Sequence, residues 1–536
     1  MTTGAAGSKQ DVEAVVIGAG TAGLTAAAYL AALGRHVVVV DRQAMPGGNT
    51  AAFTHDDYEF DIGLHYLGGW AGSHPGLRAV LEPLGVNLRY RELDPDGFDH
   101  LLFDDMTFRV PRGIEEFRGR LHEQFPEERD RIDRHLHRIA AIVDELERCT
   151  PVRLEPRSLL TTLWRTRVAA ASSMITLGRW FDHLGCSPRL RTVLNWCHGV
   201  TGVAPSHVSL TMHAAAVMSY LAGAWYPEGG GRAVVDALTS VIRDHGGEII
   251  LETEVDEIHV GDDGVRGVRI TDTGGASHEL ATRTVIAAAD IKHTYAQLLA
   301  KADVPARVQR RVRDYRMATP LFVTYLVLDR DLRAEGAGDH NWWVYLDDDI
   351  DGLYDACARG ESRVSGAFVT SASLKDPDNP RWCRAGQTNL QVVGLAPASH
   401  AFWGAGIAYA RRKIEFRDAL LALAERAIPG LQEAIVYEDS ASPLTWERYL
   451  RNSGGTSYGI AATPDQFFAR RPGAKTRIPG LYLAGASTAS GHGITGVATG
   501  GMEAAALAAV APAWPKPHGT QNRPKAPSGT AVRAGH

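Results

Sequence analysis

The stretch EAVVIGAGTAGLTAAAYLAALGRHVVVVDR, residues 13–42, decides the fold of this chain. A short apolar run leads into three glycines, Gly18, Gly20 and Gly23, and an alanine-rich, helix-forming segment follows them. Four valines then lead to Asp41, an acid about 20 residues after the glycines. A strand, a glycine turn, a helix, a second strand and a terminal acid in this order predict a βαβ unit that binds a dinucleotide.

Each residue type in this unit has a physical task. The first glycine makes the tight turn, the second lets the backbone approach a pyrophosphate, and the third lets the helix pack closely on the strand. The helix start, including Thr21 and Ala22, directs free N–H groups and the positive end of the helix dipole at the phosphates. Asp41 accepts hydrogen bonds from ribose hydroxyls, and Arg42 either flanks the adenosine or lies on the surface. The chain shows one such unit, which leaves NAD and FAD both open.

Length, charge and cysteine content limit the class of protein. A chain of 536 residues is too long for one hydrophobic core, so two or more domains are expected. The net charge of −6 and the pI near 6.4 give no electrostatic case for binding nucleic acid. Five cysteines without a CxxC pair predict reduced thiols, no metal site and a cytoplasmic location. We expect neither a signal peptide nor a transmembrane helix.

The pattern along the chain predicts two interleaved domains. Three segments are expected to form a discontinuous nucleotide-binding domain: residues 13–110, 223–300 and 441–512. Two insertions are expected to form a substrate-binding domain: residues 111–222, whose helical spacing predicts a helical lid, and residues 301–440, which mix strands and turns. The two ends carry few apolar residues and are predicted to be disordered tails: residues 1–12 and 513–536.

Several further stretches resemble one enzyme family. They are the Gly47–Gly48 pair after Asp41, FDIGLHYLGG (Phe60 to Gly69), SASLKDPDNP (Ser371 to Pro380), SPLTWERYLRNSGGTSYG (Ser442 to Gly459) and LYLAGASTASGHGITGVATGG (from Leu481). Together these stretches resemble FAD-dependent oxidoreductases of the phytoene desaturase, carotenoid isomerase and retinol saturase group. The resemblance implies an α/β fold: a Rossmann-like FAD-binding domain of the amine-oxidase (GR2) type with a discontinuous, mixed α+β substrate domain.

The resemblance also implies which residues contact FAD. The helix that begins near Ile494 would direct its N-terminus at the isoalloxazine ring and stabilise the negative charge that hydride transfer places there. Val255 would pair its backbone with the adenine. Ala486 stands where many relatives carry an acid, so that contact either comes from the backbone here or is missing. The full set implied by the resemblance is Gly47, Gly48, Val255, Gly485, Ala486, Gly493, Ile494, Thr495, Gly496 and Val497.

Two histidines and four aromatic residues are candidates for the substrate side. His65 and His492 lie in the glycine-rich stretches that the family pattern places near the flavin, and either could move a proton beside the reacting carbon. The aromatic residues either line an apolar pocket or fill cores: Tyr66, Trp70, Trp343 and Trp403.

The leading hypothesis is an FAD-dependent oxidoreductase acting on C–C or C=C bonds of a long apolar substrate, carotenoid-like or retinoid-like, by hydride transfer at flavin N5. The alternatives are oxidation of amines or amino acids, redox-neutral isomerisation of a polyene or fatty acid, and a non-enzymatic prenyl-lipid escort of the same fold. NADPH and other electron carriers are candidate partners. The sequence has no second glycine unit for a nicotinamide, so NADPH would have to reach the flavin face, or another electron carrier would serve. The segment Ser158 to Leu184 is either a peripheral membrane contact or part of the lid. The oligomeric state has no signal in the sequence.

Overall fold

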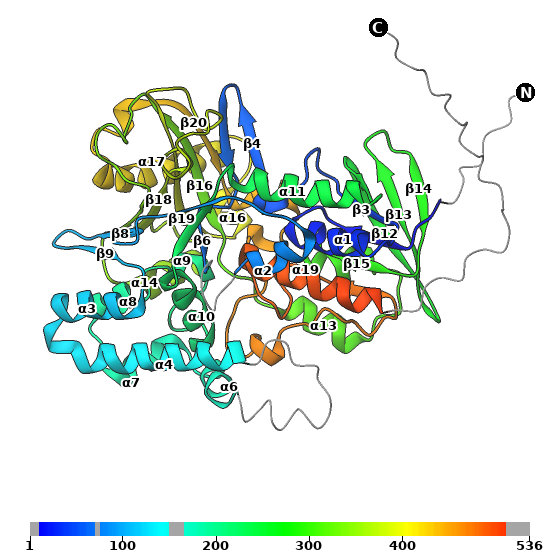
Figure 1. Cartoon of the computed structure of the whole chain (residues 1–536), viewed down its shortest axis with the longest axis horizontal. Helices are drawn as coiled ribbons and strands as arrows, with labels where there is room; N and C mark the ends of the chain where they lie inside the picture. The colour runs from blue at the N-terminus through cyan, green and yellow to red at the C-terminus, as the bar shows by residue number, and fades with distance from the viewer. Residues whose placement is uncertain (1–9, 70–75, 149–165, 511–536) are drawn as a thin grey trace, which may run out of the picture.

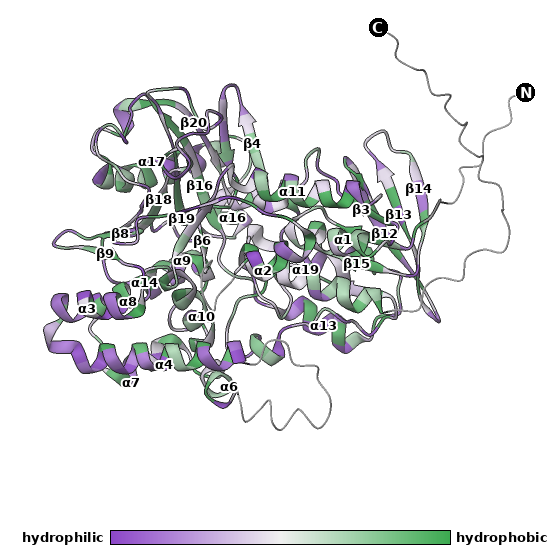
Figure 2. Cartoon of the chain, in the orientation of Figure 1, coloured by the Kyte–Doolittle hydropathy of each residue, from purple (hydrophilic) through white to green (hydrophobic). Residues whose placement is uncertain are grey.

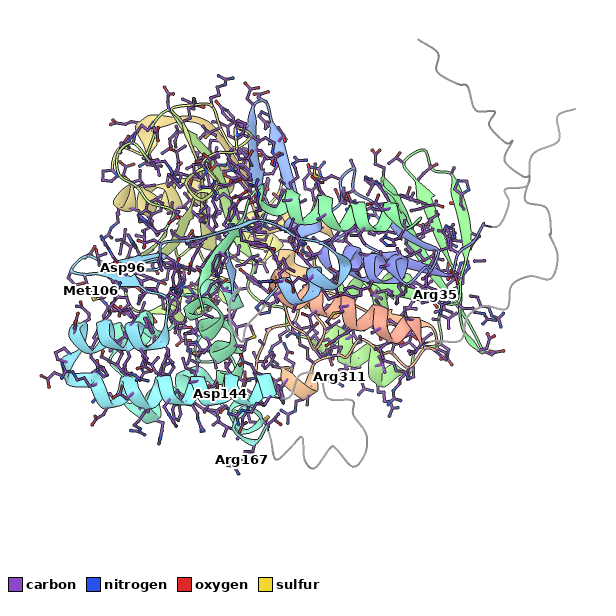
Figure 3. The ribbon with its side chains drawn as sticks, viewed as in Figure 1. Arg35, Asp96, Met106, Asp144, Arg167 and Arg311 are labelled. Atoms are coloured by element: carbon purple, nitrogen blue, oxygen red, sulfur yellow. The ribbon has the colours of Figure 1, made fainter. Side chains whose placement is uncertain are left out.

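A computed structural model describes residues 10–69, 76–148 and 166–510 of the chain. Figure 1 shows two lobes: the first carries β3 (Val37–Val40), β15 (Val285–Ala287), α1 (Thr21–Ala32) and α19 (Gly493–Ala509), and the second carries a larger sheet with a layer of helices beside it. Figure 3 labels Arg35 at the outer end of the first lobe and Asp96 and Met106 at the opposite end of the molecule.

The first lobe contains a five-stranded sheet in which every pair is parallel. Its order is β11 (Glu248–Ile250), β3 (Val37–Val40), β2 (Ala14–Ile17), β15 (Val285–Ala287) and β21 (Leu481–Leu483). Val37 and Val39 pack on the helices of one face, whereas Val38 and Val40 pack on a second sheet. Burial on both faces explains the unbroken valine run.

Helices cover one face of this sheet and a small sheet covers the other. The helices are α1 (Thr21–Ala32), α11 (Gly230–Asp244) and α19 (Gly493–Ala509). The small sheet has the order β1 (Gln10–Asp11), β14 (Ser277–Ala281), β13 (Gly264–Asp272) and β12 (Thr253–Gly261). This layered arrangement confirms the predicted α/β fold with a Rossmann-like domain.

The second lobe is built on a seven-stranded mixed sheet. Its order is β20 (Ile435–Ala441), β16 (Leu321–Leu328), β19 (Thr388–Leu395), β18 (Gly366–Thr370), β17 (Asn341–Tyr345), β8 (Asp99–Leu102) and β9 (Thr107–Val110). The pairs are antiparallel except for β17 with β8. The long helix α17 (Ile407–Ala427) packs on one face through Phe416 and Leu420, and the other face turns toward the first lobe.

A group of helices completes the second lobe. They include α3 (Ile114–Gln124), α4 (Arg129–Arg148), α6 (Arg167–Ser173), α7 (Leu177–Leu184), α8 (Pro188–Leu194), α9 (His198–Thr201) and α10 (Leu210–Leu221). Figure 2 shows α3 and α4 largely hydrophilic and the strands of the large sheet largely hydrophobic. Leu177, Phe181 and Leu184 of α7 are buried in the main core, so these residues of the candidate membrane segment pack inside the lid. None of the helices in the described ranges is long and apolar enough to cross a membrane.

The remaining described elements are two small sheets and several helices. A three-stranded sheet has the order β6 (Leu67–Gly68), β10 (Ala224–Pro227) and β7 (Tyr90–Glu92), and a hairpin is made of β4 (Ala52–His55) and β5 (Tyr58–Asp61). The other helices are α2 (Arg78–Leu81), α12 (Ile291–His293), α13 (Ala306–Asp314), α14 (Ile350–Arg359), α15 (Ala372–Lys375), α16 (His400–Trp403) and α18 (Pro443–Leu450).

The structure corrects three of the predicted domain boundaries. Strands β8 and β9 fall inside the predicted nucleotide-binding segment 13–110 but complete the large sheet of the second lobe. Helix α13 falls inside the predicted substrate segment 301–440, yet Val312 packs in the core of the first lobe. Residues Gln10 and Asp11, predicted as tail, form β1 and pair with β14. Val12, also predicted as tail, is buried in the core of the first lobe. The other residues of the predicted tails, 1–9 and 513–536, lie outside the described residues.

Candidate active site

A cavity of about 310 Å³, here called the nucleotide cavity, lies at the carboxyl edge of the five-stranded sheet. Gly18 follows β2, Asp41 follows β3, Ala288 follows β15 and Gly485 comes soon after β21, and all four line the cavity. Ligands of open α/β sheets bind at this edge, because the connecting loops diverge there.

The three glycines of the first turn differ in their surroundings. A Cβ at Gly23 would lie 1.9 Å from the carbonyl oxygen of Gly18, so glycine is required where α1 crosses its strand. A Cβ at Gly20 would meet nothing within 4 Å, because this position faces the open cavity. Gly18 has a φ of +100°, which favours glycine. Gly23 is therefore needed for the close contact between α1 and its strand, whereas Gly20 lines the nucleotide cavity. Thr21 and Ala22 also line this cavity.

Asp41 and Arg42 organise the far end of the nucleotide cavity. The Asp41 carboxylate accepts hydrogen bonds from the backbone N–H groups of Ala19 at 2.7 Å and Gln43 at 2.8 Å. Burial raises the pKa of Asp41, while these backbone hydrogen bonds and the Arg42 charge lower it. The Arg42 guanidinium donates to the carbonyls of Arg448 and Tyr449. Arg42 therefore ties the end of α18 to this edge of the cavity.

The opposite end of the cavity is formed by the start of α19. This helix begins at Gly493, and its N-cap residue His492 makes no side-chain cap. The first-turn N–H groups are therefore available to a ligand with negative charge. Gly485, Ala486, Gly493, Ile494 and Val497 line the nucleotide cavity, as do Gly47, Gly48 and Val255 from the other predicted segments. Thr495 and Gly496 line a neighbouring cavity instead.

This neighbouring cavity, here called the apolar cavity, has a volume of about 830 Å³. It lies between the first lobe, the large sheet and α10, and its walls include Leu67, Met212, Trp343, Phe368 and Leu395. A cavity of this size and character suits a large apolar small molecule.

The two cavities meet along a shared wall. Six residues line both of them: Gly63, His65, Leu321, Tyr458, Gly493 and Ile494. A group bound at the α19 end of the nucleotide cavity would therefore face a molecule bound in the apolar cavity.

His65 and His492 both lie at this junction or beside it. His65 lines both cavities and His492 lines the apolar cavity. Burial lowers the pKa of each imidazole to about 3. The Nε2 of His492 lies 3.1 Å from the carbonyl oxygen of Val200, which fixes the proton on that nitrogen. Both imidazoles are therefore neutral near pH 7, so neither serves there as a cationic acid.

The four predicted pocket aromatics have different outcomes. Tyr66 and Trp343 line the apolar cavity. Trp403 does not: it is fully buried in the core beneath α17, stacked on Phe322, with its indole N–H donated to the carbonyl of Pro397. The prediction for Trp403 is wrong because its side chain lies on the opposite face of the large sheet. Trp70 lies outside the described residues.

Several lining residues were not singled out from the sequence. Asn49, Glu254 and Asp290 line the nucleotide cavity, and Tyr458 lies at the junction with its ring 5.2 Å from that of His492. Tyr458 stands in the TSYG part of a stretch that was quoted only for its resemblance. A polar residue shortly after a buried strand, such as Asp290 three residues after the end of β15, is the signal that could have identified that position.

The residues around the nucleotide cavity fit FAD. Two helices, α1 and α19, present N-termini without side-chain caps to the nucleotide cavity. Such N-termini suit a pyrophosphate and an electron-rich ring edge. The backbone at Gly48 comes close to the first glycine turn, since a Cβ at Gly48 would lie 3.2 Å from the Cα of Gly20.

Comparison with known proteins agrees with this geometry. The chain is 26% identical over 507 residues to all-trans-retinol 13,14-reductase of Danio rerio, which covers 89% of this chain and 82% of that protein. It is 24% identical to prolycopene isomerase 2 of an Oncidium hybrid cultivar (92% and 83% covered). It is 27% identical to a neurosporene-forming phytoene desaturase of Rhodobacter capsulatus (94% and 94% covered). These relatives match the family resemblance found in the sequence.

Solved structures show the same fold. An oxidoreductase from Methanosarcina mazei superposes with a TM-score of 0.61 at 17% identity, covering 91% of this chain and 99% of that one. The model of the flavin-containing amine oxidoreductase family matches residues 21–509. The family is flavin-containing, and the nucleotide cavity fits FAD. FAD is therefore the cofactor, and the protein is an FAD-dependent enzyme. The chain belongs to the flavin-containing amine oxidoreductase family.

Proposed function

We propose that this enzyme oxidises, reduces or isomerises C–C and C=C bonds of a long apolar polyene of the carotenoid or retinoid type. The observation that carries the proposal is the apolar cavity of about 830 Å³, which shares six lining residues with the nucleotide cavity, two of them at the start of α19. Relatives named for retinol, prolycopene and phytoene support the same substrate class. Family membership favours an enzyme over a prenyl-lipid escort.

FAD supplies hydride exchange at N5 when it is bound. The chain's own residues prepare the site for that exchange. The first-turn N–H groups of α19 stabilise negative charge on the ring edge that they face. Gly63, His65 and Tyr458 line both cavities and so lie between the cofactor space and the substrate space. Apolar walls such as Trp343 and Phe368 exclude water from the reacting carbon.

The roles of His65 and His492 follow from their neutral state. A neutral imidazole donates one hydrogen bond and accepts another, so it can orient a substrate. We propose that both histidines position the polyene beside the flavin; with a pKa of about 3, neither imidazole is a general base at neutral pH.

The experiment is an absorbance spectrum of the purified protein between about 300 and 550 nm, where bound flavin absorbs near ~370 and ~450 nm. The holoenzyme is then mixed anaerobically with NADPH and all-trans-retinol or prolycopene. In a separate anaerobic series an artificial two-electron acceptor replaces NADPH, and the substrates are phytoene and, as the amine control, putrescine. Product formation from a polyene supports the proposal. Turnover of the amine alone, or of none of these, would refute it.

The electron partner and the location belong to the same proposal. Loss of the flavin absorbance on adding NADPH favours C=C reduction, because NADPH then supplies the electrons. Desaturation instead needs an electron acceptor that reoxidises the flavin. We propose a cytoplasmic protein that touches a membrane peripherally to take up its substrate. Cell fractionation tests this: a membrane-associated fraction that high salt releases supports it, and a detergent-only extraction contradicts it.

A further inference from the structure

Lys375 lies deep in the protein at the end of α15, within the SASLKDPDNP stretch that resembled the family without an assigned task. Its side chain is 2% exposed. The ammonium donates a hydrogen bond to the carbonyl oxygen of His65 at 2.8 Å and another to the Thr370 hydroxyl. It also lies 5.7 Å from the centre of the Tyr66 ring.

A second route leads from the same ammonium to Tyr66. Thr370 donates to the Asn341 amide oxygen at 2.7 Å, and the Asn341 amide donates to the Asp99 carboxylate at 2.9 Å. The hydroxyl of Tyr66 donates to the other oxygen of Asp99, also at 2.9 Å. Lys375 thus holds the backbone carbonyl of His65 directly, and it holds the Tyr66 hydroxyl through Thr370, Asn341 and Asp99. Because His65 and Tyr66 are adjacent in the chain, these hydrogen bonds form one closed circuit.

The circuit joins segments that are far apart in the chain. Thr370 ends β18 and Lys375 ends α15, whereas Asn341 comes from β17 and Asp99 from β8, all in the second lobe. His65 lines both cavities. The network therefore fixes the wall between the cavities against the large sheet.

The charges around Lys375 explain why a lysine is tolerated there. Burial lowers its pKa to about 7, while the carboxylates of Asp99, Asp339 and Asp61 raise it. Nearby uncharged groups, Thr370 and the ring of Tyr226 at 5.6 Å, complete its surroundings. Hydrogen bonds in a buried network of this kind strengthen one another and restrict the segments that they join.

We propose that Lys375 is a positioning residue of the active site: through the His65 carbonyl and the Thr370–Asn341–Asp99–Tyr66 circuit it fixes the His65–Tyr66 segment between cofactor and substrate. The inference rests on the proposed function for its turnover readout. Its second readout, the visible circular dichroism of bound FAD, needs no substrate.

The test compares Lys375→Met, which keeps the length of the side chain and removes the donors, with Lys301→Met, a control at an exposed lysine. The expected result for Lys375→Met is an unchanged flavin content, an altered visible dichroism and a kcat on the polyene about 10- to 100-fold lower, with KM changed much less. Lys301→Met should match the wild type in every readout.

A second pair guards against a variant that does not fold. Thr370→Val breaks the circuit but leaves the ammonium, and Thr324→Val removes a buried hydroxyl from β16 of the same sheet outside the circuit. Thr370→Val should alter the dichroism and lower kcat by a smaller factor than Lys375→Met, whereas Thr324→Val should not. A folded Lys375→Met with wild-type dichroism and kcat, or Thr370→Val identical to Thr324→Val, would overturn the proposal. A wild type that ignores every polyene would instead refute the proposed function, and the dichroism comparison would still decide the role of Lys375.

Discussion

Replacing Gly20 and Gly23 separately by alanine should damage the protein in two different ways. A Cβ at Gly23 would lie 1.9 Å from a backbone oxygen, which cannot swing aside as a side chain can. Helix α1 must then move by roughly 1 Å, and overpacking of this kind costs about 1–3 kcal/mol of unfolding free energy. A Cβ at Gly20 meets no atom within 4 Å, and its φ of −71° suits alanine. Gly20→Ala should therefore fold normally.

The effect on FAD binding should be larger for Gly20→Ala than for Gly23→Ala. The new methyl group would stand in the nucleotide cavity, where the backbone must approach a pyrophosphate. We expect the contact between this methyl group and the pyrophosphate to cost about 1.4 kcal/mol or more of binding free energy. Gly20→Ala should therefore weaken FAD binding by ~10-fold or more. Gly23→Ala should lower the melting temperature of the apoprotein by several degrees.

The assay measures the apoprotein's melting temperature and a fluorescence titration with FAD for each variant. Gly119→Ala serves as the control, because Gly119 lies inside α3 with nothing near its Cβ, and alanine should stabilise that helix slightly. The reasoning would be refuted by a Gly20→Ala protein that binds FAD like the wild type together with a Gly23→Ala protein as stable as the wild type.

Three further predictions follow from the same structure. Trp403→Ala should cost about 3–5 kcal/mol of stability, measured by thermal unfolding, yet leave the spectrum of bound FAD unchanged, because Trp403 lies in the core beneath α17; a changed spectrum with full stability would contradict its placement. Trp343→Ala should enlarge the apolar cavity and raise kcat/KM for a bulkier polyene relative to kcat/KM for a slimmer one. An unchanged ratio of these two values would count against Trp343 as a wall of the cavity. Burial lowers the pKa of His135 to about 3, so the folded state excludes a proton that the unfolded chain binds below pH ~6.5. Stability should therefore fall as pH drops from about 6.5 toward 3, by up to ~1.4 kcal/mol per unit for this residue, and a urea-unfolding series in which His135→Leu does not flatten that dependence would refute it.

The nucleotide-binding part of the fold could be predicted from the sequence because its signals are local. The glycine turn and Asp41 lie within about 20 residues of each other, and each residue type is demanded by backbone geometry or phosphate contact. The same holds for the start of α19 after the Gly491–Gly493 turn.

The substrate side could not be predicted in the same way, because it depends on long-range pairing. Strand β8 pairs with β17 about 240 residues further along the chain, so Asp99 was assigned to the wrong domain. Trp343 and Trp403 look alike in the sequence, and only the faces of the sheet separate a cavity wall from a core residue. The hydrogen bond from Lys375 to His65 spans 310 residues and leaves no local pattern.

A crystal structure of the holoenzyme with FAD and all-trans-retinol bound tests the central claim most directly. The account predicts the isoalloxazine ring at the wall formed by Gly63, His65, Tyr458 and Ile494, with the polyene chain in the apolar cavity against Trp343. A ring placed away from this wall, or a polyene bound outside the apolar cavity, would contradict it.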